Sequence, residues 1–146
     1  MLKRMTAPCC PRCGACDCRA AFDACLVLDY SDSRYGTVHH LTVATYMLQH
    51  GIYADGVTAD AARFIIRHID RPPDPYTMKE LRRHTDGATK VVSPDSATSQ
   101  RLQREWPYTI RDVDTSSEHT YRRTVRRWAK SVADQILELR DPLPGS

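Results

Sequence analysis

The sequence lacks the features of membrane, fibrous and exported proteins. No apolar run in its 146 residues approaches the ~20 residues that a membrane-spanning helix needs. Six glycines and nine prolines are too few for a collagen-like or low-complexity chain. The segment from Met1 to Pro8 carries charge but none of the apolar stretch of a signal peptide. We therefore expect a cytoplasmic protein with no membrane partner.

Several catalytic patterns are also absent from the sequence. There is no H-E-x-x-H motif of zinc proteases, no H-x-E motif of zinc deaminases and no glycine-rich phosphate-binding loop. No glutamate precedes Glu80, so aspartate is the only carboxylate close in sequence to the N-terminal cysteines. The net charge of +3 is divided between both halves of the chain and by itself indicates no nucleic-acid or membrane partner.

Cysteine is the residue type that stands out. Five of the six cysteines lie within residues 9–18, and only Cys25 stands apart. Disulfides are rare in reducing compartments, and neighbours such as Cys9 and Cys10 are difficult to bridge without strain. The cluster therefore predicts a metal site, with a disulfide or redox role as the alternative. Zinc is the expected ion because it is redox-silent and suits thiolate ligands.

Residues 10–14 form a C-P-x-C-G pattern in which each residue type has a role. The thiolates of Cys10 and Cys13 can reach one ion at about 2.3 Å. Pro11 fixes φ in the tight turn, and Gly14 permits a left-handed backbone after the second ligand. Backbone N–H groups of the turn can then donate to the Cys10 sulfur. The pattern predicts Cys10 and Cys13 as the first two ligands.

The third ligand is Cys18 or Cys16, with Cys9 as a further possibility. We favour Cys18 because it lies at the mouth of the next expected helix, where the dipole and free N–H groups stabilise a thiolate. Cys25 shares an apolar stripe with Phe22 and is expected to be a buried core cysteine.

The segment 38–50 is an expected helix with three histidines, from which we take the fourth ligand. His39 and His50 are separated by about 16 Å of helix rise, so only one of them can serve the site. His39 opens this helix as Cys18 opens the preceding one, and we predict it as the fourth zinc ligand, with His50 off the metal. The adjacent His40 points about 100° away from His39. A fourth cysteine is the other possibility.

The spacing of apolar residues predicts a mainly α protein, a small helical domain with an N-terminal zinc knuckle packed on the helices. In the last helix, apolar residues recur at steps of three and four from Tyr121 to Leu139. Residues 1–8 are expected to be a disordered lead-in, 9–140 a single domain and 141–146 a tail. The expected helices span 19–30, 38–50, 59–70, 78–85, 94–106 and 116–140, with a loop at 31–36 and a short strand or extended arm at 108–113.

The combination of these motifs resembles a bacterial domain-of-unknown-function family. The resemblance rests on the C-P-x-C-G pattern, on Cys18-x-x-x-Phe22-Asp23, on H-x-L-x-V-x-x-Y-x-x-Q-H from His39 to His50, and on the segments 106–113 and 125–129. The resemblance implies an architecture for the chain but assigns no reaction to it. It favours Cys10, Cys13 and Cys18 over Cys9 and Cys16, and His39 over His40. Gly51 stands where that family usually has proline.

Three functions fit these features. The one we favour is a small bacterial zinc protein whose metal site is structural and which acts as a binding or regulatory module, because four ligands can be filled from the sequence and a closed tetrahedral site does no Lewis-acid chemistry. The second is a zinc-dependent metalloenzyme with an open coordination position, lined by Tyr46 and His50. The third is a nucleic-acid-binding protein that uses the basic C-terminal helix. We expect no catalytic residue. The sequence is compatible with a protein partner but does not identify one.

The basic face of the last expected helix gives a test of the third function. Acidic residues lie nearby in sequence, so we expect a solvated surface that binds DNA or RNA weakly and with a steep dependence on salt. An electrophoretic or fluorescence titration at physiological salt measures this. Tight binding that is lost when Arg122, Arg123, Arg126 and Arg127 are neutralised would contradict the expectation.

Overall fold

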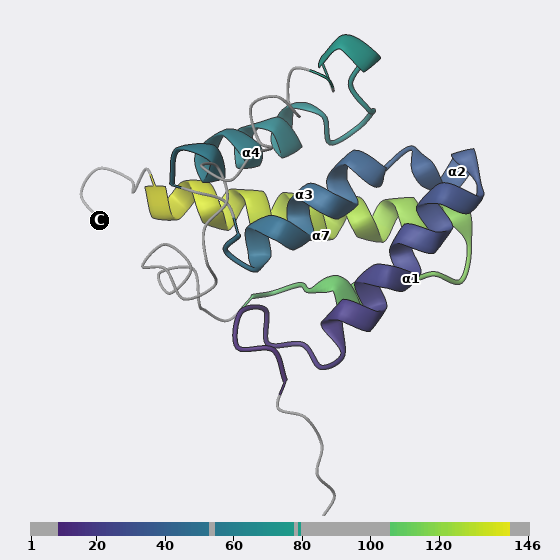
Figure 1. Ribbon diagram of the computed structural model, residues 1–146, viewed down its shortest axis with the longest axis horizontal. Helices are drawn as coiled ribbons and strands as arrows, with labels where there is room; N and C mark the ends of the chain where they lie inside the picture. The colour runs from purple at the N-terminus through teal and green to yellow at the C-terminus, as the bar shows by residue number, and fades with distance from the viewer. Residues whose placement is uncertain (1–8, 53–54, 78, 80–105, 141–146) are drawn as a thin grey trace, which may run out of the picture.

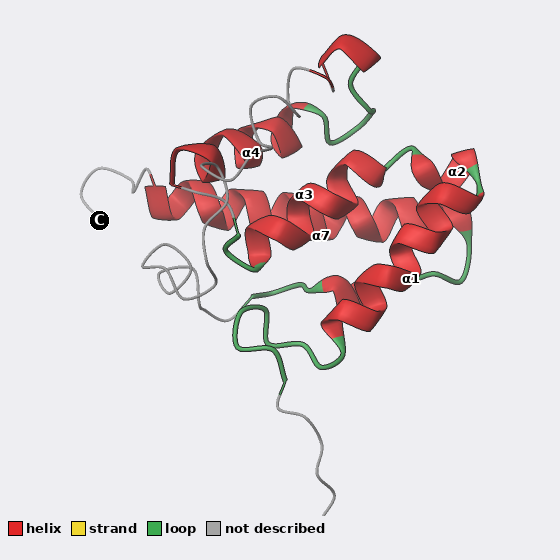
Figure 2. Cartoon of the chain, in the orientation of Figure 1, coloured by secondary structure: helices red, strands yellow, loops and turns green. Residues whose placement is uncertain are grey.

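The computed structural model describes residues 9–52, 55–77, 79 and 106–140 (Figure 1). Figure 2 shows helices and connecting loops in this part of the chain and no strand, which confirms the mainly α prediction. None of the helices described is both long and apolar enough to cross a membrane. The elements are α1 (Cys18–Ser31), α2 (Ser33–Gly36), α3 (His39–Gln49), α4 (Asp55–Arg67), η2 (Ile110–Asp112) and α7 (Glu118–Arg140).

The long helix α7 carries the core. Its N-terminus is capped by Ser117, whose hydroxyl accepts a hydrogen bond from the backbone N–H of Thr120 at 3.1 Å. The predicted apolar stripe is confirmed over its described side chains, since Tyr121, Val125, Trp128, Val132 and Ile136 have no exposed surface. This stripe packs against α3 and α4, which lie side by side across it (Figure 1).

Helices α1 and α3 run antiparallel, joined by the single turn of α2 (Figure 1). Asp32 begins that turn, because its carboxylate accepts a hydrogen bond from the Arg34 N–H at 2.8 Å. Gly36 ends it against the end of α1, where a β-carbon would stand 2.7 Å from the Asp29 carbonyl oxygen. The reversal brings the first residue of α1 to the last residues of α3.

Gln49 connects three parts of the chain from a fully buried position. Its side-chain oxygen accepts a hydrogen bond from the Trp128 indole at 3.1 Å, and its amide nitrogen donates to the Tyr108 carbonyl at 2.7 Å. The end of α3 is thereby fixed to α7 and to the extended segment that precedes η2.

The structure differs from the sequence-based predictions at several places. The expected loop 31–36 contains the helical turn α2. Helix α4 begins four residues and ends three residues before the predicted 59–70, and α7 begins two residues after the predicted start at 116. The expected arm at 108–113 contains the 3₁₀ turn η2, closed by reciprocal hydrogen bonds between Thr109 and Asp112. The predicted lead-in 1–8, helices 78–85 and 94–106 and tail 141–146 lie wholly or almost wholly outside the described residues.

A buried carboxylate ties the end of α1 to the start of α3. The Asp29 side chain has no exposed surface, and it accepts hydrogen bonds from His39 Nδ1 at 2.8 Å and from the Tyr121 hydroxyl at 2.6 Å. A buried charge is tolerated only with such partners. His39 Nε2 lies 3.2 Å from the hydroxyl of the exposed Tyr30, so both ring nitrogens of His39 are engaged here.

Replacing His39 tests this linkage. His39→Ala leaves the buried Asp29 with one partner fewer, and we expect the free energy of unfolding to fall by about 2 kcal/mol or more. The exposed His119 on α7 supplies the matched control, His119→Ala, for which we expect a change within about 0.5 kcal/mol. Denaturant titration followed by circular dichroism measures both, and equal effects of the two substitutions would contradict the assignment.

Candidate metal centre

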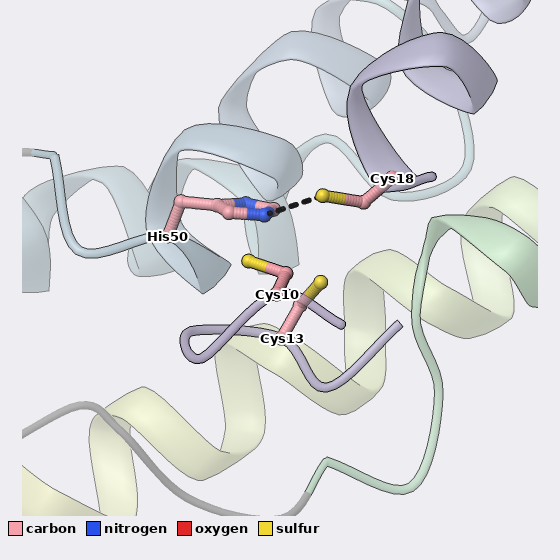
Figure 3. Close-up of side chains that lie close together, drawn as sticks. All are labelled: Cys10, Cys13, Cys18 and His50. Atoms are coloured by element: carbon pink, nitrogen blue, oxygen red, sulfur yellow. Dashed lines mark hydrogen bonds between the residues drawn. The ribbon is translucent and has the colours of Figure 1, made fainter. Parts of the chain in front are cut away.

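Three thiols and one imidazole converge where the N-terminal loop meets the helices (Figure 3). The sulfur atoms of Cys10, Cys13 and Cys18 and a ring nitrogen of His50 all lie within 4.8 Å of one another. Cys18 Sγ and His50 Nε2 are 3.5 Å apart. Four donors at such separations surround a space of the size that one tetrahedral metal ion fills.

The loop that holds Cys10 and Cys13 is a tight hairpin of backbone hydrogen bonds. The Gly14 N–H donates to the Cys10 carbonyl at 2.8 Å, and the Cys10 N–H donates to the Ala15 carbonyl at 2.9 Å. Gly14 has φ of 83°, the left-handed conformation that the sequence predicts for it. Backbone N–H groups of Arg12 and Ala15 donate to the sulfurs of Cys10 and Cys13, each at 3.4 Å. Each of these hydrogen bonds favours the thiolate form of the cysteine that accepts it.

The N-terminus of α1 supplies Cys18. The preceding residue, Asp17, has φ of 57°, and this left-handed step turns the chain from the loop into the helix. Cys18 is therefore the first helical residue. The Tyr46 hydroxyl donates to its sulfur at 3.9 Å.

His50 directly follows the last residue of α3, and two contacts with Tyr46 hold its ring in place. Its Nδ1 lies 2.7 Å from the Tyr46 carbonyl oxygen and donates to it, so Nε2 carries the lone pair that faces the sulfurs. The ring stacks on Tyr46, with centroids 4.1 Å apart, and Tyr46 stacks on Phe22 of α1 at 3.9 Å. The imidazole is thus oriented so that its Nε2 could bind a metal ion together with the three sulfurs.

The pKa values of His50, Cys13 and Cys10 are shifted by burial and by neighbouring groups. Burial lowers the pKa of His50, which keeps its ring neutral. Burial raises the pKa of Cys13 to about 12, and the neighbouring thiols of Cys10 and Cys18 add to that rise. For Cys10, burial raises the pKa but the backbone N–H groups of Cys13 and Arg12 outweigh it, so the value lies below the ordinary one. Three thiolates at these distances need a cation between them to ionise together.

The charge of Arg12 fits such a cation site. Its Nη1 atom is buried without a hydrogen-bond partner, and its positive charge contributes to lowering the pKa of His50, which places it close to the cluster. Three thiolates, one neutral imidazole and a divalent ion carry a net charge of −1. The partly buried Arg12 guanidinium would compensate that charge. The residues present therefore fit a divalent metal.

The structure brings together three of the four predicted ligands. Cys10, Cys13 and Cys18 lie in the cluster, while His39 lies at the opposite end of α3, where its ring is bonded to Asp29 and Tyr30. The expectation that His39 would face the thiols is corrected by the antiparallel course of α1 and α3. That course sets the start of one helix beside the end of the other, so His50 occupies the place expected for His39.

The remaining candidates of the sequence analysis have other partners. Cys9 and Cys16, the alternatives to Cys18, are joined to each other by a disulfide. His40 is buried, and its Nε2 donates to the His68 carbonyl at 2.8 Å. Cys25 is a free thiol with 2% of its surface exposed, and burial raises its pKa to about 11, as befits the expected core residue.

Comparison with known proteins places the chain in a family. Residues 8–137 match the family described as Family of unknown function (DUF5946), and the chain belongs to it. The match spans the metal loop, both helices that complete the cluster and most of α7. No curated protein and no solved structure matches the chain.

The two ends of α3 give a direct test of the ligand set. His50→Ala removes a donor, and we expect metal affinity to fall by more than the 10–100-fold typical of changes outside the coordination shell. His39→Ala leaves all four donors in place and should retain the metal, even though it destabilises the fold. Metal retained per chain after dialysis against a weak chelator measures the difference. Loss of metal from the His39 variant with retention in the His50 variant would restore His39 as the ligand.

Proposed function

We propose that Cys10, Cys13, Cys18 and His50 hold one zinc ion and that this ion is structural. The observation that supports this most is the convergence of four protein donors from three separate parts of the chain within 4.8 Å of one another. Three thiolates and one imidazole form a standard closed tetrahedral zinc site. With four protein ligands, no coordination position is left for water or substrate.

The chemistry of the donors favours zinc over other divalent ions. Thiolate ligands disfavour the hard ions magnesium and calcium, which take oxygen ligands. Zinc accepts the irregular tetrahedron that a loop and two helix ends can offer because it has no electronic preference of geometry. The backbone N–H groups of Arg12 and Ala15 donate hydrogen bonds that reduce the negative charge on the Cys10 and Cys13 sulfurs. Such hydrogen bonds suit a site that retains its ion.

The ion would act as a cross-link between the loop and the α1–α3 hairpin. The loop has few apolar side chains of its own, and the Trp106 indole N–H donates to the Arg12 carbonyl at 2.8 Å as a further tie to the C-terminal half. Zinc binding free energy is folding free energy where the site exists only in the folded state. The loop conformation would then depend on the metal.

A groove next to the proposed zinc site supports a role in binding or regulation. A groove of about 740 Å³ runs between the metal loop and the segment 106–112. Its walls include Cys13 and Gly14 on one side and Trp106 and Arg111 on the other. We propose that the protein is a zinc-stabilised helical module that presents this groove to a partner.

Metal analysis tests the structural role. We expect about one zinc per chain, and removal of zinc by a strong chelator should lower the helical circular dichroism signal and the melting temperature. Cys10→Ser and Cys13→Ser should each lose the ion. Cys25→Ala is the matched control, because Cys25 is a buried cysteine outside the cluster, and it should keep the ion.

Cobalt substitution identifies the coordination shell. A closed shell of three sulfurs and one nitrogen gives intense visible bands and sulfur-to-cobalt charge transfer, which added anions do not alter. Bands that shift with azide or cyanide would indicate an open position and would favour the metalloenzyme instead. Protein that holds no metal when prepared without chelator would contradict the proposal as a whole.

A further inference from the structure

Two cysteines of the N-terminal loop take no part in the metal cluster. Cys9 and Cys16 are bonded to each other, and both are exposed to solvent. The described free thiols are those of Cys10, Cys13, Cys18 and Cys25, of which three belong to the cluster and one to the core. The disulfide is therefore chemically separate from the ligands although it lies beside them in sequence.

The disulfide closes a ring around two of the ligands. Cys9 and Cys16 are seven positions apart, and Cys10 and Cys13 lie between them. The same ring contains the hydrogen bond from the Cys10 N–H to the Ala15 carbonyl at 2.9 Å, directly inside the covalent bond. The covalent link and the hydrogen bond hold the two ends of the loop together, and with them the spacing of the two sulfurs.

One sulfur of the pair is open to approach by a reactant. Cys16 lines the groove of about 740 Å³ together with Trp106 and Arg111. The charged residues that line this groove are Arg111, Asp17 and Asp112, and Trp106 forms an aromatic wall. Access to one of the two sulfurs is the first condition that thiol–disulfide exchange requires, and the exposed Cys16 meets it.

We propose that Cys9 and Cys16 form a thiol–disulfide exchange site whose oxidised form preorganises the metal loop. The reactant is a thiol of low molecular weight, such as glutathione. Its thiolate attacks Cys16 Sγ, the Cys9–Cys16 bond breaks and Cys9 leaves as a thiolate that takes a proton. A second thiol then attacks the mixed disulfide and releases Cys16. Two electrons pass from two thiols to the pair, and the thiols leave as one disulfide.

The consequence for the metal rests on the zinc site proposed above. The closed ring restricts the loop before the ion binds, so less conformational entropy is lost on binding. Reduction opens the ring and removes that advantage. By the entropy of closing a ring of this length, zinc affinity should be between about tenfold and a hundredfold higher in the oxidised protein.

Peptide mapping tests the exchange site without reference to the metal. Trypsin cleaves after Arg12, so the disulfide links two separate peptides, one with Cys9 and the other with Cys16. After equilibration in glutathione buffers, we expect four alkylated cysteines under oxidising conditions and six under reducing ones. The double variant Cys9→Ser/Cys16→Ser should show four throughout. Six alkylated cysteines under every buffer, or a linkage between other cysteines, would overturn the proposal.

Competition for zinc with a chromogenic chelator tests the coupling. The oxidised protein should hold zinc about tenfold or more tightly than the reduced protein, and the double serine variant should show the weaker affinity in both buffers. Cys25→Ala should behave as the unmodified chain. Equal affinities in the two buffers would overturn the coupling, whereas absence of zinc binding in both would overturn the proposed function and leave the peptide map as an independent result.

Discussion

The antiparallel packing of α1 on α3 is the constraint on which the rest of the structure depends. Its centre is the stack of Phe22 on Tyr46, with ring centroids 3.9 Å apart. From this contact, one helical turn toward the start of α1 and one toward the end of α3 lead to Cys18 and His50. In the opposite direction the same register brings Asp29 to His39. One packing interaction thus determines both the Cys18–His50 contact of the candidate metal site and the hydrogen bond between Asp29 and His39.

The cluster combines groups that would each be unfavourable alone. Cys13 is almost fully buried, three thiols crowd one another, and the Arg12 guanidinium has a buried nitrogen without a partner. A divalent ion reverses the sign of each effect, because it attracts the thiolates and leaves a negative complex for Arg12 to offset. The groups in the cluster are therefore suited to a divalent cation.

Much of this arrangement could be predicted from the sequence, and the failures have a common cause. The stripe of α7 and the grouping of Cys10, Cys13 and Cys18 follow from local spacing, as does the left-handed Gly14. The choice of His39 over His50 depends on how two helices pair, which local spacing does not determine. One signal was available: Cys18 and Phe22 repeat at four residues, as do Tyr46 and His50, and two such pairs match only when the helices run in opposite directions. The partnership of Cys9 with Cys16 has no such signal.

Each of the two tryptophans of the chain donates a hydrogen bond next to one side of the candidate metal centre. The Trp106 indole donates to the carbonyl of Arg12, which lies between Cys10 and Cys13, and the Trp128 indole donates to Gln49, which precedes His50. Indole emission responds to hydrogen bonding and to the polarity of its surroundings. The intrinsic fluorescence of this protein should therefore depend on the conformation of the site. Trp106 responds to changes in the loop, and Trp128 responds to changes at the end of α3.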